Sequence, residues 1–170
     1  RCRRNMADTG FKSPSASTTG GWLFLSNCYS SNNAYATTTS VTFVNGDVSV
    51  FAFGVPTNAI IDGIEVTAEF SNQFAGVTST IQLSLSDNGG SSYTATKSDT
   101  VVGTTDTTRT YGGATDLWGA GSFSEYGTQD GNFYVKVEGK TSSGGFSCRL
   151  DHIQAKIYYH EATANMFFLL

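Results

Sequence analysis

The sequence predicts an all-β protein, a single antiparallel β-sandwich of jelly-roll type with about eight strands and no significant helix. Three observations point to this fold class. Apolar and polar residues alternate with period two in several segments, and turn signals built from Gly, Asn and Asp separate these segments about every 8 to 12 residues. No segment of the 170-residue chain places apolar residues at the spacing of an amphipathic helix.

The alternation is most regular in residues 60–70, which we expect to form a core strand with one face in water. The residues between its inward positions are polar. The inward positions are Ile64, Val66, Ala68 and Phe70. The same pattern predicts strands over 77–86, 133–138 and 152–160, and shorter strands are expected over 21–25 and 91–98.

Residues 41–55 are expected to form a hairpin. Asn45-Gly46 separates two apolar runs, and this dipeptide is the strongest short-range signal for a tight turn between paired strands. The second run, 48–55, is apolar on both faces, so it needs cover on both sides. We expect loops of the other sheet or a neighbouring subunit to cover Phe51 and Phe53, and we assign both residues to an assembly interface.

The two ends of the chain are expected to lie outside the sandwich, which we place at residues 21–162. Residues 1–20 are small and polar, as in a flexible arm, and residues 1–5 are either native or a remnant of an upstream start. Residues 163–170 form an apolar tail, whose burial is worth roughly several kcal/mol at ~25 cal/mol per Å2. It can bury on its own sheet edge or, as we favour, in a neighbouring subunit. The assembly residues of this tail are Met166, Phe167, Phe168, Leu169 and Leu170.

The composition argues against several partners. Only 14% of residues are charged and the net charge is −4, so the chain lacks the strongly basic surface that nucleic acid requires. No apolar run approaches the roughly 20 residues of a membrane span, and we expect neither membrane attachment nor a signal peptide. The cysteines Cys2, Cys28 and Cys148 lack CxxC spacing, which argues against a zinc knuckle and leaves a Cys28–Cys148 bridge open.

No pattern of residues indicates catalysis. His152 and His160 lie on one predicted strand about 26 Å apart, at ~3.3 Å per residue, so they cannot share a metal ion. Asp151 precedes His152, and neighbours on a strand point to opposite faces, which argues against half of a catalytic triad. We therefore expect a protein that is not an enzyme and binds no cofactor.

Two sets of loop residues could bind a ligand. Asp87, Asp116 and Asp130 lie in Gly-rich segments, but their spacing does not match a calcium loop, so turn formation explains them better and no metal site is assigned. Aromatic residues also fall in loops, where they commonly close a sandwich core. This interpretation is favoured over stacking on a sugar ligand. The candidate stacking residues are Tyr111, Trp118 and Tyr126.

Three segments carry a family resemblance: FAFGVPTNAIIDGIEVTAEF at 51–70, TYGGATDLWG at 110–119 and LDHIQAKIYYH at 150–160. Together they resemble a β-sandwich module of structural proteins from tailed bacteriophages and of phage-derived bacterial genes. The similarity runs from about residue 22 to residue 160. These motifs are typical of a fold and bring no catalytic residues with them.

The resemblance implies a non-enzymatic structural protein of a virion, either a capsid decoration protein, a head fibre or a tail protein. Such a protein is made in the host cytoplasm and acts in the particle, through contacts with copies of itself and with other virion proteins. Two alternatives stay open. One is a glycan- or receptor-binding module that uses the loop aromatics, and the other is a subunit of a cell-surface filament whose C-terminal tail completes a neighbour's sheet.

Overall fold

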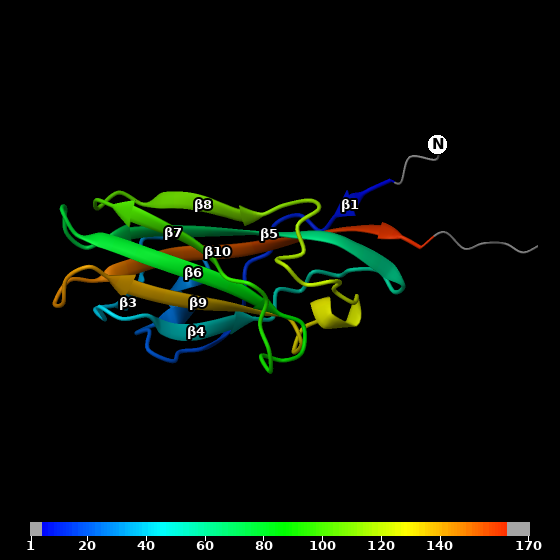
Figure 1. The fold of residues 1–170 in the computed structure, drawn as a ribbon, viewed down its shortest axis with the longest axis horizontal. Helices are drawn as coiled ribbons and strands as arrows, with labels where there is room; N and C mark the ends of the chain where they lie inside the picture. The colour runs from blue at the N-terminus through cyan, green and yellow to red at the C-terminus, as the bar shows by residue number, and fades with distance from the viewer. Residues whose placement is uncertain (1–4, 163–170) are drawn as a thin grey trace, which may run out of the picture.

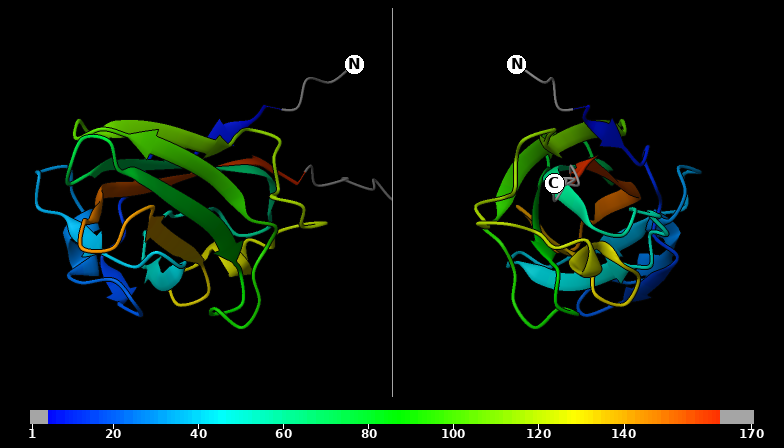
Figure 2. Two further views of the ribbon diagram at one scale, coloured as in Figure 1. Left: turned by 60° about the vertical axis from the view of Figure 1, so that its left-hand side comes forward. Right: turned by 90° about the vertical axis from the view of Figure 1, so that its right-hand side faces the viewer.

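The computed structural model describes residues 5–162, and it confirms the predicted fold class. Two antiparallel sheets face each other in a sandwich (Figures 1 and 2). Sheet A has the order β1-β10-β5-β8, with β3 also paired to β10, and sheet B has the order β2-β4-β9-β6-β7. None of the helices in the described part of the chain is long and apolar enough to span a bilayer.

The chain passes from one sheet to the other several times along its length. Sheet A consists of β1 (Ala7–Asp8), β3 (Ala36–Thr38), β5 (Ala59–Asn72), β8 (Thr107–Gly112) and β10 (Cys148–Glu161). Sheet B consists of β2 (Ala16–Thr18), β4 (Val44–Ser49), β6 (Thr78–Ser86), β7 (Lys97–Val102) and β9 (Tyr134–Thr141). Two short 3-10 helices complete the described part, η1 (Leu25–Cys28) and η2 (Tyr126–Thr128).

The core lies between the sheets and is centred on β5 and β10. These two strands have 14 residues each and pair along their whole length, for example Ala68 with Ile153. Their inward apolar positions, among them Ile64, Ala68, Ile153 and Ile157, are fully buried, which confirms the alternation seen in the sequence. β6 pairs with β7, which begins at Lys97 and not at residue 91 as predicted, so residues 87–96 form a longer connection.

The segment expected to be a flexible arm lies along the chain's own two sheets. β1 pairs with β10, β2 pairs with β4, and Lys12 forms a further bridge to Ala155. The edges of β10 and β4 would otherwise present unpaired N–H and C=O groups, and this segment supplies their partners. The apolar tail that we assigned to assembly, from Met166 to Leu170, lies outside the described residues.

The predicted hairpin at Asn45-Gly46 is wrong. Both residues lie inside β4, which is paired on its two sides with β2 and β9. A Cβ atom at Gly46 would stand 2.6 Å from Cδ2 of Leu25. Glycine therefore serves here to admit a core side chain against the sheet, rather than to turn the chain.

The predicted strand over 48–55 is also wrong beyond Ser49, where β4 ends. Val50, Ala52 and Gly54 adopt left-handed backbone, with φ of 60°, 53° and 67°. With every second residue left-handed, Phe51 and Phe53 lie on the same side, their rings stacked with centroids 5.2 Å apart.

Both rings meet Phe133 edge-on inside the core, and they are only 2% and 6% exposed. The chain itself covers Phe51 and Phe53. They therefore do not offer a neighbouring subunit the surface that the sequence analysis expected.

The strand expected over 21–25 is irregular, with a single bridge from Leu23 to Thr37. The ring of Trp22 enters the core instead, where its Nε1 donates a hydrogen bond to the carbonyl of Val137 at 3.1 Å. A Cβ atom at Gly139 would lie 2.3 Å from this ring. Packing of the Trp22 indole against the sheet is thus incompatible with a regular strand over residues 21–25.

Cys28 and Cys148 are both buried and both free, so the bridge left open by the sequence does not form. Burial raises the pKa of the Cys28 thiol to about 12 and that of Cys148 to about 11.

In a natively folded Cys2→Ser variant, we expect neither Cys28 nor Cys148 to react with a disulfide reagent at pH 8. The reagent cannot reach the buried sulfur atoms, and the reactive thiolate form is scarce at that pH. Unfolding in guanidinium should expose two thiols per chain. A native protein that reacts at the rate of the unfolded one would contradict this burial.

Candidate functional site

Two of the three predicted stacking residues are enclosed in the fold. Trp118 is 1% exposed and Tyr111 is 6% exposed. The Nε1 group of Trp118 donates a hydrogen bond to the carbonyl of Ile64 at 2.9 Å, and the amide of Gly113 donates to the same carbonyl at 3.1 Å. These two rings close the core beside β5 and β8, so they cannot stack on a ligand.

Asp116 is part of the same closure. Its Oδ1 accepts a hydrogen bond from the amide of Trp118 at 2.7 Å, and its Oδ2 lies 2.8 Å from Nζ of Lys97. The Lys97 ammonium group lowers the pKa of the Asp116 carboxyl, and the amide of Trp118 adds to this effect. This carboxylate therefore holds the loop over β5 and is not available to a cation.

Tyr126 is the third stacking candidate, and its side chain is 64% exposed. It is the first residue of η2, at the same end of the sandwich as the connection between β4 and β5 (Figure 1). A pocket of about 340 Å3 lies between that connection and the end of η2. We call it the end pocket, and it is lined by Ala52, Phe53, Gly54, Val55, Thr128, Gln129 and Asp130.

The end pocket presents fixed hydrogen-bonding groups. Oδ1 of Asp130 accepts a hydrogen bond from the amide of Ala52 at 3.0 Å, which orients the carboxylate. In the described part of the chain, no group accepts a hydrogen bond from the amides of Phe53, Gly54 and Val55. The left-handed residues that direct these amides include Ala52, and such a backbone conformation in a non-glycine residue costs roughly 1–3 kcal/mol.

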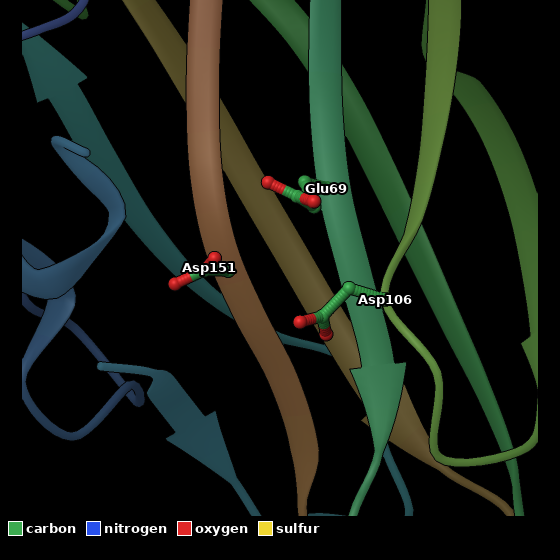
Figure 3. Close-up of side chains that lie close together, drawn as sticks. All are labelled: Glu69, Asp106 and Asp151. Atoms are coloured by element: carbon green, nitrogen blue, oxygen red, sulfur yellow. The ribbon is translucent and has the colours of Figure 1, made fainter. Parts of the chain in front are cut away.

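A cluster of three carboxylates lies elsewhere, on sheet A. Each of Glu69, Asp106 and Asp151 offers one oxygen, and the three oxygens lie within 4.8 Å of one another (Figure 3). Glu69 belongs to β5, Asp151 to β10, and Asp106 to the connection between β7 and β8. We call this group the acidic cluster. No pattern in the sequence predicts that these three residues meet.

The segment between η1 and β3 covers the acidic cluster. The hydroxyl of Tyr35 donates a hydrogen bond to Oδ2 of Asp106 at 2.9 Å, and the amide of Asn32 points to Oδ1 of Asp151 at 3.4 Å. Burial and the hydrogen bond to Asp106 raise the pKa of Tyr35 to about 12. The phenol therefore stays protonated and acts as a donor at neutral pH.

The two histidines have separate partners. Nε2 of His152 lies 2.9 Å from Oγ of Ser13, and Nδ1 of His160 lies 2.8 Å from a carboxylate oxygen of Asp62. Burial lowers the pKa of His152, and the nearby carboxylates of Glu69 and Asp151 offset this only in part. His152 thus contacts a serine, but in residues 5–162 no carboxylate accepts a hydrogen bond from its Nδ1, so the third member of a hydrolase triad is lacking there.

Asp151 and His152 do not lie on opposite faces of the sheet, in contrast to the alternation predicted for neighbours on a strand. The register between β10 and β5 shifts between Leu150 and His152, which is the mark of a β-bulge. Leu150 and Ile153 are both fully buried in the core, with two residues between them instead of one. The extra residue is Asp151, and the bulge brings its carboxylate toward Glu69 (Figure 3).

The sequence matches no protein-family model and no curated protein. Solved structures with similar folds include a family 16 carbohydrate-binding module, at 8% identity and a TM-score of 0.43 over 81% of this chain and 85% of that one. TmCBM61 in complex with β-1,4-galactotriose aligns at 11% identity and a TM-score of 0.38, covering 91% and 88% of the two chains.

A third similar structure contains the CBM22-1 and GH10 modules of Clostridium thermocellum xylanase 10B with xylohexaose. It has 11% identity and a TM-score of 0.42 over 86% of this chain and 26% of that one. TM-scores below 0.5 carry no information about the function of this chain. Nothing in these comparisons shows a bacteriophage origin.

Proposed function

We propose that this chain is a non-enzymatic glycan-binding module that holds an oligosaccharide in the end pocket. The observation that carries the proposal is the exposed ring of Tyr126 on η2, the same short helix whose last residue lines a pocket with fixed polar groups. This is one of the two alternatives that the sequence leaves open; of its three stacking residues only Tyr126 is retained, and the polar groups of the end pocket are added.

The chemistry of the end pocket suits a sugar. Sugar hydroxyls both donate and accept hydrogen bonds, so they can pair with the Asp130 carboxylate and with the amides of Phe53 and Gly54. The apolar face of a pyranose ring can pack on Tyr126, whose ring offers a large rigid surface. Asp130 gives the pocket a negative charge, and the chain has a net charge of −4, so an uncharged glycan is the expected ligand.

Assembly in a virion stays a prediction with less support. The family resemblance implies it, and the assembly interface predicted for it has two sets of residues, of which one, Phe51 and Phe53, is buried in the chain's own core. The other, residues 163–170, lies outside the described residues. Contacts with virion proteins, self-association and assembly as a filament subunit would therefore depend on that tail, whereas virion location rests on the family resemblance alone.

Tyr126→Ala should weaken glycan binding by roughly ten-fold or more, because it removes the stacking surface. The melting temperature should stay within about 2 °C of the wild type, since an exposed side chain contributes little to stability. A glycan array identifies the ligand of the wild-type protein, and calorimetry with that ligand then measures both variants.

Phe74→Ala is the matched control. Phe74 is 49% exposed and follows β5 at the opposite end of the sandwich (Figure 1), so its loss should leave glycan affinity unchanged. Asp130→Asn tests the polar half of the pocket and should also reduce affinity. Full affinity in both Tyr126→Ala and Asp130→Asn, or no glycan bound by the wild type, would show that the proposal is wrong.

A further inference from the structure

The acidic cluster is built into the fold and is independent of the end pocket. Glu69 follows the buried Ala68 on β5, so its side chain lies on the outer face of sheet A. Asp106 approaches from the connection before β8, and Asp151 approaches from the bulge in β10. Figure 3 shows the three carboxylates directed into one shared space.

Asp151 is almost fully buried without an adequate partner. Its exposed fraction is 1%, and its one hydrogen-bond contact in residues 5–162 is the amide of Asn32 at 3.4 Å, which is long for such a bond. Oδ1 of Asp106 is also buried and has no hydrogen-bond donor. Buried carboxylate oxygens normally have close donors, so the unpaired Oδ1 of Asp106 and the weakly paired Asp151 carboxylate point to a missing ligand.

No positive group of the described chain neutralises the cluster. No Lys, Arg or His nitrogen in residues 5–162 lies within 4.0 Å of the three carboxylates. The nearby guanidinium group of Arg149 stacks on the ring of Tyr35, at 5.0 Å from its centroid. Three carboxylates that meet in a largely dry space repel one another, and a bound cation would remove this repulsion.

The chemistry of the cluster favours calcium. The three carboxylate oxygens lie within 4.8 Å of one another, close enough to contact one ion. Ca2+ accepts about six to eight oxygens in an irregular arrangement, whereas Mg2+ demands a near-ideal octahedron and keeps most of its own waters. Carboxylate oxygens are also the ligands that hard cations prefer, and water can complete the sphere beside the partly exposed Glu69.

We propose that Glu69, Asp106 and Asp151 bind a calcium ion that fastens the connection before β8 to the β5–β10 pair. The covering segment is held at the same place, because Tyr35 donates to Asp106 and Asn32 approaches Asp151. The ion would thus tie together parts of the chain that are far apart in sequence. Its role is structural, and it does not touch the end pocket.

The test uses the full chain after removal of metal with EDTA. Calcium at about 100-fold above its Kd should raise the melting temperature by about 5–10 °C, and magnesium at the same concentration should raise it much less. Terbium should occupy the same site, and excitation of the adjacent Tyr35 should give sensitised terbium emission that calcium displaces.

Asp151→Asn and Glu69→Gln should each lose most of the calcium-dependent shift and of the terbium emission. Glu69 is the more exposed of the two, so Glu69→Gln keeps the test valid if Asp151→Asn fails to fold. Glu161→Gln, at the exposed end of β10, is the control and should behave as the wild type.

Two results would overturn the proposal. The first is a wild-type protein that shows neither a calcium-dependent rise in melting temperature nor terbium emission. The second is a Glu69→Gln variant that retains both at wild-type strength. A response to magnesium equal to that to calcium would show that the cluster does not select the larger ion.

Discussion

Trp118→Ala is expected to destabilise the chain by about 3–5 kcal/mol, which lowers the melting temperature by roughly 6–20 °C. The indole is 1% exposed, so its removal leaves a large cavity in the core. It also removes the hydrogen bond from Nε1 to the carbonyl of Ile64. Chemical denaturation with guanidinium measures the free energy of unfolding directly.

The same substitution is a poor test of ligand binding, because loss of binding would follow from loss of fold. Tyr126→Ala is the comparison, since it removes an aromatic ring of similar sequence context that is 64% exposed. If Trp118→Ala unfolded at the same denaturant concentration as Tyr126→Ala, the enclosure of Trp118 would be wrong, and stacking of a ligand on its ring would have to be reconsidered.

Gly63→Ala is expected to destabilise the chain by about 3 kcal/mol or more, and to lower the melting temperature by roughly 6–12 °C. A Cβ atom at this position would lie 2.2 Å from the carbonyl oxygen of Gly113 and 2.5 Å from the carbonyl carbon of Ala114. These are main-chain atoms, so the loop itself would have to move away from β5, and its hydrogen bonds to Ile64 would weaken.

Gly121→Ala provides the control for this substitution. A Cβ atom at Gly121 has no neighbour within 4 Å, and the residue does not have a positive φ. Its stability should change by less than about 1 kcal/mol. Equal melting temperatures for the two variants would contradict the close contact between β5 and the 113–114 segment.

The contact between β5 and this loop gives a physical meaning to the motifs that carried the family resemblance. Gly63 and Ile64 belong to the first motif, and Gly113, Asp116 and Trp118 belong to the second. In the structure Ile64 forms main-chain and indole hydrogen bonds with the second motif, and Gly63 packs closely against Gly113. The two motifs therefore describe one structural closure. They indicate a fold and do not by themselves indicate a virion.

The acidic cluster could not be found by reading along the chain. Glu69 has the alternation of an ordinary outward strand residue, and Asp106 lies among turn-forming residues. Asp151 was expected to point away from the face of its neighbour, and only the bulge in β10 changes this. A bulge depends on how two strands pair, so it leaves no reliable trace in one strand's sequence.

The residues of the proposed glycan site were only partly predictable. The loop position of Tyr126 predicts a stacking residue, but the same signal also selects two rings that the fold encloses. Sequence alone does not distinguish an aromatic residue that closes a core from one that faces solvent, because both types occur at strand ends. It could not be predicted that the amides of residues 53–55 have no acceptor in the described part of the chain, because the apolar run in that segment indicates a strand, in which amides are paired.

The sequence by itself determined the class of fold and the longest strands, because the period-two alternation in β5, β6, β9 and β10 directly reflects burial on one face. The tertiary structure alone decided where Gly46 admits Leu25, where the chain turns left-handed at Val50 and Ala52, and which carboxylates meet. These features depend on contacts between residues distant in sequence. Local periodicity carries no information about such contacts, and both proposed sites are made of them.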